Sequence, residues 1–264
     1  MRIAIVALLT AVHVLVCVSL SPDALGSWIS ASHLAVKLLA AAGCAAAAYS
    51  LVRKDPARWF WTPMAACYTL LALLELPMAR ALALGSLAGA ATLHDAFLVA
   101  ANVLSVVGAL VLAWIFRQGV RLSGVGAYLL AAVIAAAVVK HGFQTELATA
   151  LSSGAFSAWA STLSYLADGV TFVLLVPVVR RMFQLGFTSE TRPWWAYIAS
   201  GACWLLFSSM ERLQSAAGAS ALMPTEVLRT AATLLAGLAG LYQRDLAFLR
   251  RGASAPRARG AEGA

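Results

Sequence analysis

The sequence predicts an all-α fold, a polytopic membrane bundle of about eight transmembrane helices. Of the 264 residues, 62% are hydrophobic and only 11% are charged, and the mean hydropathy is +0.84. A soluble domain carries about 25% charged residues, so this chain has too few polar side chains to cover a water-facing surface. The apolar residues also fall in runs of about 18 to 22, the length that a helix needs to cross about 30 Å of hydrocarbon.

The apolar runs begin and end at charged or turn-forming residues, which set the expected bounds of each helix. The first run follows Arg2; because it is long and no small-residue cleavage site follows it, we expect an uncleaved span rather than a secretory signal peptide. Trp59 and Trp61, beside a basic loop, are expected to lie in the membrane interface. The expected spans cover residues 3–20, 33–52, 59–78, 95–116, 124–139, 162–179, 193–210 and 225–242.

Three longer connections are expected between these spans. Residues 21–32 hold a proline and a glycine and are predicted to form a short loop. Residues 79–93 are weakly polar and fit either a loop in the interface or a shallow re-entrant segment. Residues 142–161, rich in serine, are expected to form a polar connection. Within the sixth span, Pro177 should kink the helix, because proline removes a backbone hydrogen bond.

The distribution of Lys and Arg predicts the orientation of the bundle. With eight spans both termini lie on one side, and fourteen of the nineteen basic residues then fall on that side. Because basic residues concentrate in cytoplasmic loops, we expect both termini to be cytoplasmic, in a bacterial-type inner membrane. The outer half is slightly acidic, which favours cations or basic partners there. Its five basic residues are Lys37, Arg80, Lys140, Arg212 and Arg229.

Two stretches of the chain match each other and indicate an internal repeat. Residues 66–75 and 202–211 both contain Ala-Cys, then an aromatic residue, and Glu eight positions after the Cys. The two interpretations are a duplication, giving a parallel 4+4 repeat, and a chance match between Ala- and Leu-rich helices. If the match reflects a duplication, residues 1–122 and 123–251 form two four-helix halves, and a disordered basic tail over 252–264 follows them.

Charged side chains within the apolar runs are the candidate ligand-binding residues. A charge in lipid costs about 2.5 kcal/mol or more, so each one needs a partner or a function. Asp168 is the deepest carboxylate and should face the bundle interior. Lys37 is the opposite charge at a similar depth, so the two are expected to form either a structural ion pair or the core of a site. Glu75, Asp95 and Glu211 lie near the outer interface, where they could also snorkel to the headgroups.

Three histidines at outer helix ends are the candidate metal ligands, namely His33, His94 and His141. With nearby acids and methionines they could bind a divalent or soft cation such as zinc or copper, although none has a metal-ligand spacing. His13 lies mid-span without a second mid-span histidine, so a haem with two histidine ligands is not expected. The four cysteines fall within apolar runs and form no Cys-x-x-Cys pair, so they are expected to pack as small hydrophobic residues.

Several classes of function are disfavoured by what the sequence lacks. It has no G-x-S-x-G, no H-E-x-x-H and no Walker loop, and its loops are too short for a soluble catalytic domain. The basic residues form no patch interleaved with aromatic residues, which argues against nucleic acid as a partner. An enzyme is therefore not favoured; a membrane enzyme acting on lipid ranks third among the hypotheses.

The favoured function is binding or translocation of a small solute or cation at an outward-facing polar site between the two halves. The alternative is a membrane-embedded sensor, regulator or assembly subunit that acts through a membrane or cytoplasmic protein partner. In both cases the lipid bilayer surrounds the chain. Small residues such as Gly237 and Gly240 are expected to let helices pack closely, and a homo-oligomer is compatible with either function.

Overall fold

The computed structural model describes residues 2–84, 88–117, 125–217 and 222–254, and these residues form nine α-helices and no strand. The all-α prediction is therefore confirmed. In chain order the helices are α1 (Arg2–Ser19), α2 (Pro22–Ser50), α3 (Pro56–Leu84), α4 (Ala88–Phe116), α5 (Val125–Ser153), α6 (Phe156–Leu174), α7 (Val176–Leu185), α8 (Arg192–Ala217) and α9 (Leu222–Ser254).

Five of the described helical stretches are long and apolar enough to cross a membrane, by length and composition. They are α1, α2, α3, α4 and the continuous pair α6–α7. A sixth is added if the two parts of α5, which meet at a bend of 56° after Lys140, count as one span. Helices α8 and α9 are less apolar, because tryptophan, serine and charged residues are spread along them. The count of eight spans therefore stays a prediction.

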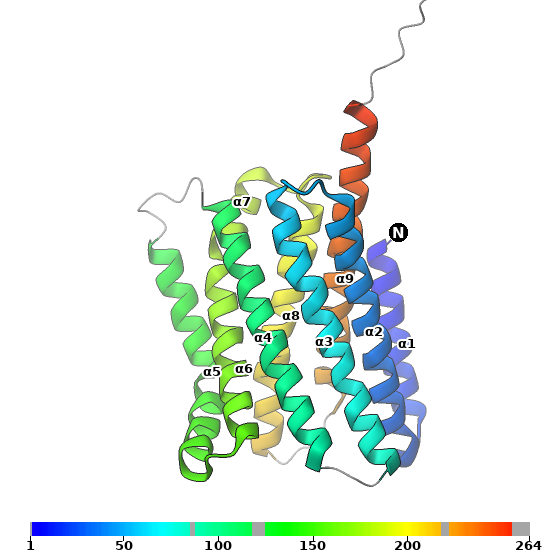
Figure 1. Ribbon diagram of the computed structural model, residues 1–264, viewed down its shortest axis with the longest axis vertical. Helices are drawn as coiled ribbons and strands as arrows, with labels where there is room; N and C mark the ends of the chain where they lie inside the picture. Colours follow the sequence, from blue (N-terminus) through cyan, green and yellow to red (C-terminus); the bar gives the residue numbers. More distant parts are fainter. Residues whose placement is uncertain (1, 85–87, 118–124, 218–221, 255–264) are drawn as a thin grey trace, which may run out of the picture.

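The long helices lie side by side along one axis and alternate in direction (Figure 1). Helix α1 packs at one edge against α9 and α2, and α5 packs at the other edge against α6. Helix α3 packs between α2 and α4, while α9 packs between α2 and α8. Helix α9, of 33 residues, continues beyond the bundle on the side where the chain begins (Figure 1).

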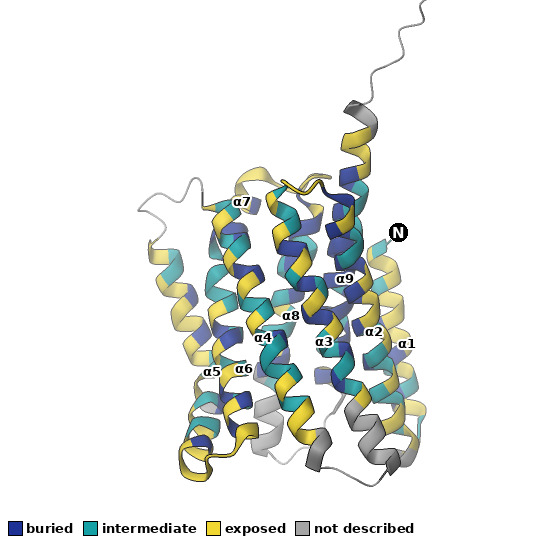
Figure 2. Ribbon diagram, viewed as in Figure 1, coloured by how far each residue is buried: buried dark blue, intermediate teal, exposed yellow. Residues whose placement is uncertain are grey.

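Many of the exposed residues on the outside of the bundle (Figure 2) are large and apolar. Helix α1 buries Thr10, His13 and Cys17 and exposes aliphatic residues such as Leu15 and Val18. Helix α5 likewise exposes a row of leucine and valine side chains. Water-soluble proteins rarely expose contiguous apolar surface over several helices, whereas lipid tails cover such a surface without cost. The burial pattern therefore agrees with the membrane-spanning composition.

Helices α2 and α9 approach each other closely at glycine positions. A methyl group on Gly43 would lie 2.3 Å from the carbonyl oxygen of Gly237, and a methyl group on Gly240 would lie 2.3 Å from that of Gly43. Ala40 and Ala236 are also fully buried in this region. Small residues let two backbones touch, and contacts of this kind hold membrane helices together. The packing role expected for Gly237 and Gly240 is confirmed.

An aromatic cluster joins α3 to α8 in the half of the bundle that contains the start of α3. Trp61 stacks on Trp194 with ring centroids 5.9 Å apart, and Phe60 meets Tyr197 edge-on at 4.9 Å. Trp61 has no exposed surface, whereas Trp59 is 66% exposed. The expected interfacial position of Trp61 is therefore wrong. Residues two apart on a helix point to opposite sides, so only one of the two tryptophans could face outward.

Two of the expected connections are helical instead. Residues 21–32 lie almost wholly in α2, which begins at Pro22; proline suits the first helical turn because its missing N–H would have no partner there. Residues 79–84 and 88–93 belong to α3 and α4 rather than to an interface loop or a re-entrant segment. A helix can continue past the hydrocarbon core, so the end of an apolar run is not the end of the helix.

The expected polar connection after the fifth span is also largely helical. Residues 142–153 form the last part of α5, and the link to α6 consists of Gly154 and Ala155. Gly154 has a φ of +65°, which glycine adopts without strain. Leu175 interrupts the helix two residues before Pro177, where the sequence predicts a kink, and α6 and α7 together form one stretch of membrane-spanning length.

The helix packing lends the proposed 4+4 repeat no support. Helix α3 packs along α4, and its counterpart α8 packs along α9. However, α2 packs along much of α3, whereas the corresponding pair in the second half, α6 and α8, touches only marginally. The repeat stays a prediction.

Candidate functional site

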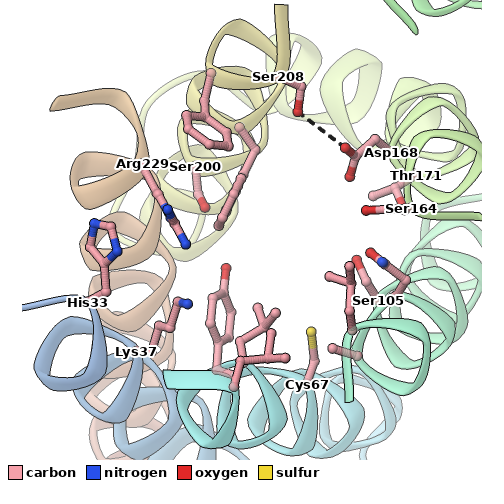
Figure 3. Close-up of a pocket in the computed structure, with 18 of the residues that line it drawn as sticks. His33, Lys37, Cys67, Ser105, Ser164, Asp168, Thr171, Ser200, Ser208 and Arg229 are labelled. Carbon is pink, nitrogen blue, oxygen red and sulfur yellow. Dashed lines mark hydrogen bonds between the residues drawn. The ribbon is translucent and has the colours of Figure 1, made fainter. Parts of the chain in front are cut away.

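A cavity of about 630 Å³ lies within the bundle, lined by α2, α3, α4, α6, α8 and α9. On α2 its lining comes from residues 26–37, which follow the turn after α1. On α8 the lining reaches Tyr197, near the start of that helix, so the cavity extends from the end of the bundle opposite the N-terminus into its other half (Figure 1). Figure 3 shows side chains of these helices pointing into it from all sides. A cavity of this size can enclose a small organic solute.

One wall of the cavity is charged. Lys37 Nζ donates a hydrogen bond to Glu75 Oε1 at 2.5 Å, and Ser30 Oγ donates to Glu75 Oε2 at 3.4 Å. The guanidinium of Arg229 lies 3.8 Å from Glu75 Oε1. Lys37 is only 3% exposed. A charge at such a position needs a nearby opposite charge, because the surroundings solvate it far less well than water does.

The facing wall carries Asp168 and a set of hydroxyl groups (Figure 3). Asp168 lies on α6 and accepts a hydrogen bond from Ser208 Oγ of α8 at 3.2 Å. Ser164 and Thr171 line the cavity beside it, because residues four before and three after a position share its helix face. The prediction that Asp168 faces the bundle interior agrees with this position.

The expected pairing of Lys37 with Asp168 is wrong. Lys37 pairs with Glu75 of α3, and Asp168 lies across the cavity from it (Figure 3). Counting residues from the end of a span gives the depth of a side chain but not the direction in which it points. Because α2 packs directly along α3, Glu75 is the nearer acid. For the same reason Lys37 and Glu75 point inward rather than toward the outer headgroups.

A second buried cluster lies beside the charged wall. Glu226 Oε2 lies 2.6 Å from His33 Nε2 and 3.6 Å from His13 Nε2. The three side chains come from α9, α2 and α1, and each is at most 8% exposed. His33 also turns its Nδ1 toward Glu75 Oε1, at 3.9 Å. His33 thus belongs both to this cluster and to the cavity lining.

The remaining candidates from the sequence divide into two groups. His94 lines the cavity, and its Nδ1 lies 3.2 Å from Asp95 Oδ1. Neither belongs to the group formed by His13, His33 and Glu226. The side chains of Glu211 and His141 lie outside the described residues. The structure therefore brings together His33, Lys37 and Glu75 from the predicted set, and places Asp168 opposite them.

Sequence reasoning missed Glu226, Arg229 and His13. On α9 the polar residues Glu226, Thr230 and Thr233 are buried and recur at helical spacing. A polar stripe with this period on an otherwise apolar helix indicates a buried polar face. That pattern could have identified Glu226 and Arg229 as inward-facing. His13 had no such pattern, because the face of α1 that packs inward is not visible in the sequence.

These features define a class of protein: an all-helical chain of membrane-spanning composition with a cavity among its helices that is lined by apolar side chains and a few charged and hydroxyl groups. Comparison with protein families, with curated proteins and with solved structures finds no match to this chain. The function must therefore be inferred from the cavity itself.

Proposed function

We propose that this chain is a multi-pass membrane protein that binds a small zwitterionic solute in its central cavity and carries it across the membrane. The observation that supports this most strongly is the placement of opposite charges on facing walls. Arg229 and Lys37 line one wall, and Asp168 lines the other. Charged groups this far inside a helical bundle commonly serve a substrate or ion pathway.

In this proposal Asp168 takes the cationic group of the solute and Arg229 takes the anionic group. Arg229 is suited to this because its Nη2 has only a long contact with Glu75, and its Nε is buried without a hydrogen-bond partner among the described residues. The guanidinium fork matches the geometry of a carboxylate. The hydroxyl groups around Asp168 supply further hydrogen bonds. Rocking of the helices about the cavity would then expose it to each side in turn.

The test is solute binding to the detergent-solubilised protein. Binding is measured as the rise in unfolding temperature in a thermal-shift assay. The panel contains zwitterionic amino acids and betaines, the matching amines, and neutral analogues. We expect Asp168→Asn to weaken binding of zwitterions and amines by roughly 10- to 100-fold, since one charge-assisted hydrogen bond contributes about 1.5–3 kcal/mol. Arg229→Gln should weaken binding of zwitterions but not of amines.

The matched control is Glu190→Gln, which changes an exposed acid far from the cavity and should leave binding unchanged. Uptake into proteoliposomes then separates binding from transport. Undiminished solute binding and uptake by a normally inserted Asp168→Asn protein would contradict the proposal.

The orientation is part of the same proposal. With both termini in the cytoplasm of a bacterial-type cell, the end of the cavity lined by Gly26 and His94 would face the outer side of an inner membrane. Lys54→Cys and Ser153→Cys, made one at a time, test this orientation because both positions are exposed and lie at opposite ends of the bundle. Cys203 is replaced by alanine in both variants, and the other three cysteines are buried. A membrane-impermeant maleimide should label Ser153→Cys in intact cells and Lys54→Cys only after permeabilisation. The reverse labelling pattern would contradict the orientation.

A second candidate function rests on the part of α9 that extends beyond the bundle. This segment exposes Phe248 and Leu249 next to Arg250 and Arg251. An apolar and basic helical surface suits a protein partner or anionic lipid, as a sensor or assembly subunit would require. Deletion of residues 248–264 removes this surface together with the basic tail, so it should abolish the output of a regulator and leave solute uptake unchanged.

A further inference from the structure

Helix α1 makes few contacts with the bundle, and the face that it buries is chemically unusual. Its buried residues are Thr10, His13 and Cys17. His13 and Cys17 are one helical turn apart and share a face. A helix that only needs to pack would bury aliphatic side chains at these positions. Helix α1 instead buries two metal-ligating side chains and leaves its leucines exposed.

These two side chains meet donors from two other helices. Glu226 Oε2 of α9 lies 3.6 Å from His13 Nε2 and 2.6 Å from His33 Nε2 of α2. Cys17 Sγ lies 3.7 Å from the same nitrogen of His13. The donor atoms of the two histidines and Glu226 all lie within 4.8 Å of one another, and all three residues are buried.

We propose that His13, His33 and Glu226, with Cys17 as the fourth ligand, bind one divalent transition-metal ion, with Zn²⁺ the best fit. Zinc holds nitrogen and oxygen at about 2.0 Å and sulfur at about 2.3 Å, so ligand atoms of a tetrahedral shell stand about 3.3–3.6 Å apart. The separations of 3.6 Å between His13 and Glu226 and of 3.7 Å between His13 and Cys17 match this shell. Cys17 Sγ lies outside the group of donors within 4.8 Å of one another, so it would move toward His33 and Glu226 on binding. The contact of 2.6 Å between His33 and Glu226 would lengthen by roughly 0.7 Å on binding.

The hydrogen bonding of the histidines supports a metal rather than a purely structural cluster. His13 Nδ1 is buried and has no hydrogen-bond partner among the described residues. Its Nε2 is too far from Glu226 for a hydrogen bond, and it has only a weak contact with sulfur. A metal bond would give Nε2 the strong partner that it lacks, while Nδ1 would stay without one among the described residues. His33 turns Nδ1 toward Glu75, as metal-bound histidines turn toward a second carboxylate.

The four ligands come from three helices, so the ion would fasten α1 to α2 and α9. A tetrahedral shell filled by protein atoms is typical of a structural zinc site. His13, Cys17 and Glu226 are not among the residues that line the solute cavity. His33 is the one proposed ligand that also lines the cavity. Metal content is measured without any solute, so its outcome can be told apart from that of the proposed transport.

The test is metal content and a cobalt spectrum of the full chain, purified in detergent under reducing conditions with a tag that contains no histidines. We expect about one Zn²⁺ per chain after incubation with zinc and desalting. Replacement by Co²⁺ should give the ligand-field bands of a four-coordinate ion and a thiolate-to-cobalt charge-transfer band. Cys17→Ala should remove the charge-transfer band. His13→Ala and Glu226→Gln should weaken Zn²⁺ binding by more than about 100-fold.

Two further variants keep the test decisive. His94→Ala removes a histidine outside this cluster and should retain full zinc content. His13→Asp keeps a ligand at the same position and should retain zinc even if His13→Ala does not fold. Zinc should raise the unfolding temperature of the wild type and of His94→Ala, but not of Glu226→Gln. A wild-type protein without stoichiometric metal, or a zinc content that only His94→Ala reduces, would overturn the proposal.

Discussion

Glu75→Gln is expected to destabilise the folded protein by about 3–5 kcal/mol, because it leaves buried charges without a partner. The Glu75 side chain is 13% exposed, accepts a hydrogen bond from Lys37 and lies 3.8 Å from Arg229. The substitution removes the carboxylate that contacts both cations, which leaves Lys37 without its hydrogen-bonded acid. Lys37→Met should cost less, because Glu75 then keeps Arg229 as a nearby cation.

Thermal unfolding in detergent micelles, followed by the fluorescence of the eight tryptophans, measures this difference. The matched control is Glu190→Gln, because Glu190 pairs with Arg250 at 3.5 Å and both side chains are more than half exposed. Solvent screens such a pair, so no measurable change in unfolding temperature is expected. If Glu190→Gln lowered the unfolding temperature as much as Glu75→Gln does, the buried pair of Glu75 and Lys37 would contribute no more to stability than an exposed pair.

Gly43→Ala and Gly240→Ala are expected to destabilise the contact between α2 and α9 by about 1–3 kcal/mol, the usual cost of overpacking. The added methyl group would lie 2.3 Å from a backbone carbonyl oxygen in each case. Backbone atoms cannot rotate away as a side chain can, so the two helices must separate. This cost exceeds the gain in helix propensity from glycine to alanine, which is about 1 kcal/mol at most.

Gly26→Ala provides the matched control, because Gly26 is also within α2 and a methyl group there meets nothing within 4 Å. The same exchange should therefore raise the unfolding temperature at position 26 and lower it at positions 43 and 240. The readout is the unfolding temperature of each variant in the same detergent. Increased stability of Gly43→Ala would contradict the close approach of the two helices.

Much of the fold was predictable from residues whose effects are local. The apolar composition and the length of the runs indicate membrane-spanning helices, and Pro177 predicts the break at Leu175. Helix ends were less predictable. Residues 21–32 and 142–153 are helical although their polarity indicated loops, because a helix continues for as long as its backbone hydrogen bonds allow, whatever medium surrounds it.

For the candidate site, the sequence predicts which residues are important but not which residues they contact. The sequence identifies Asp168, Lys37 and Glu75 as charges that must be satisfied within the bundle, since a charge in an apolar run is costly wherever the helix packs. It does not identify their partners. Lys37 pairs with Glu75 rather than with Asp168 because α2 packs along α3, and that adjacency depends on the contacts of all the helices together.

The same distinction holds for the cluster of His13, His33 and Glu226. Each residue alone is a polar side chain in an apolar stretch, and their positions in the chain are up to 213 residues apart. The apolar composition of each helix determined that the chain forms helices and that a bundle of membrane-spanning character results. Only the tertiary structure decided which helices touch and how each is rotated about its axis. Composition and spacing indicate the depth of a side chain, whereas the direction in which it points and the neighbour that it meets depend on packing between distant segments.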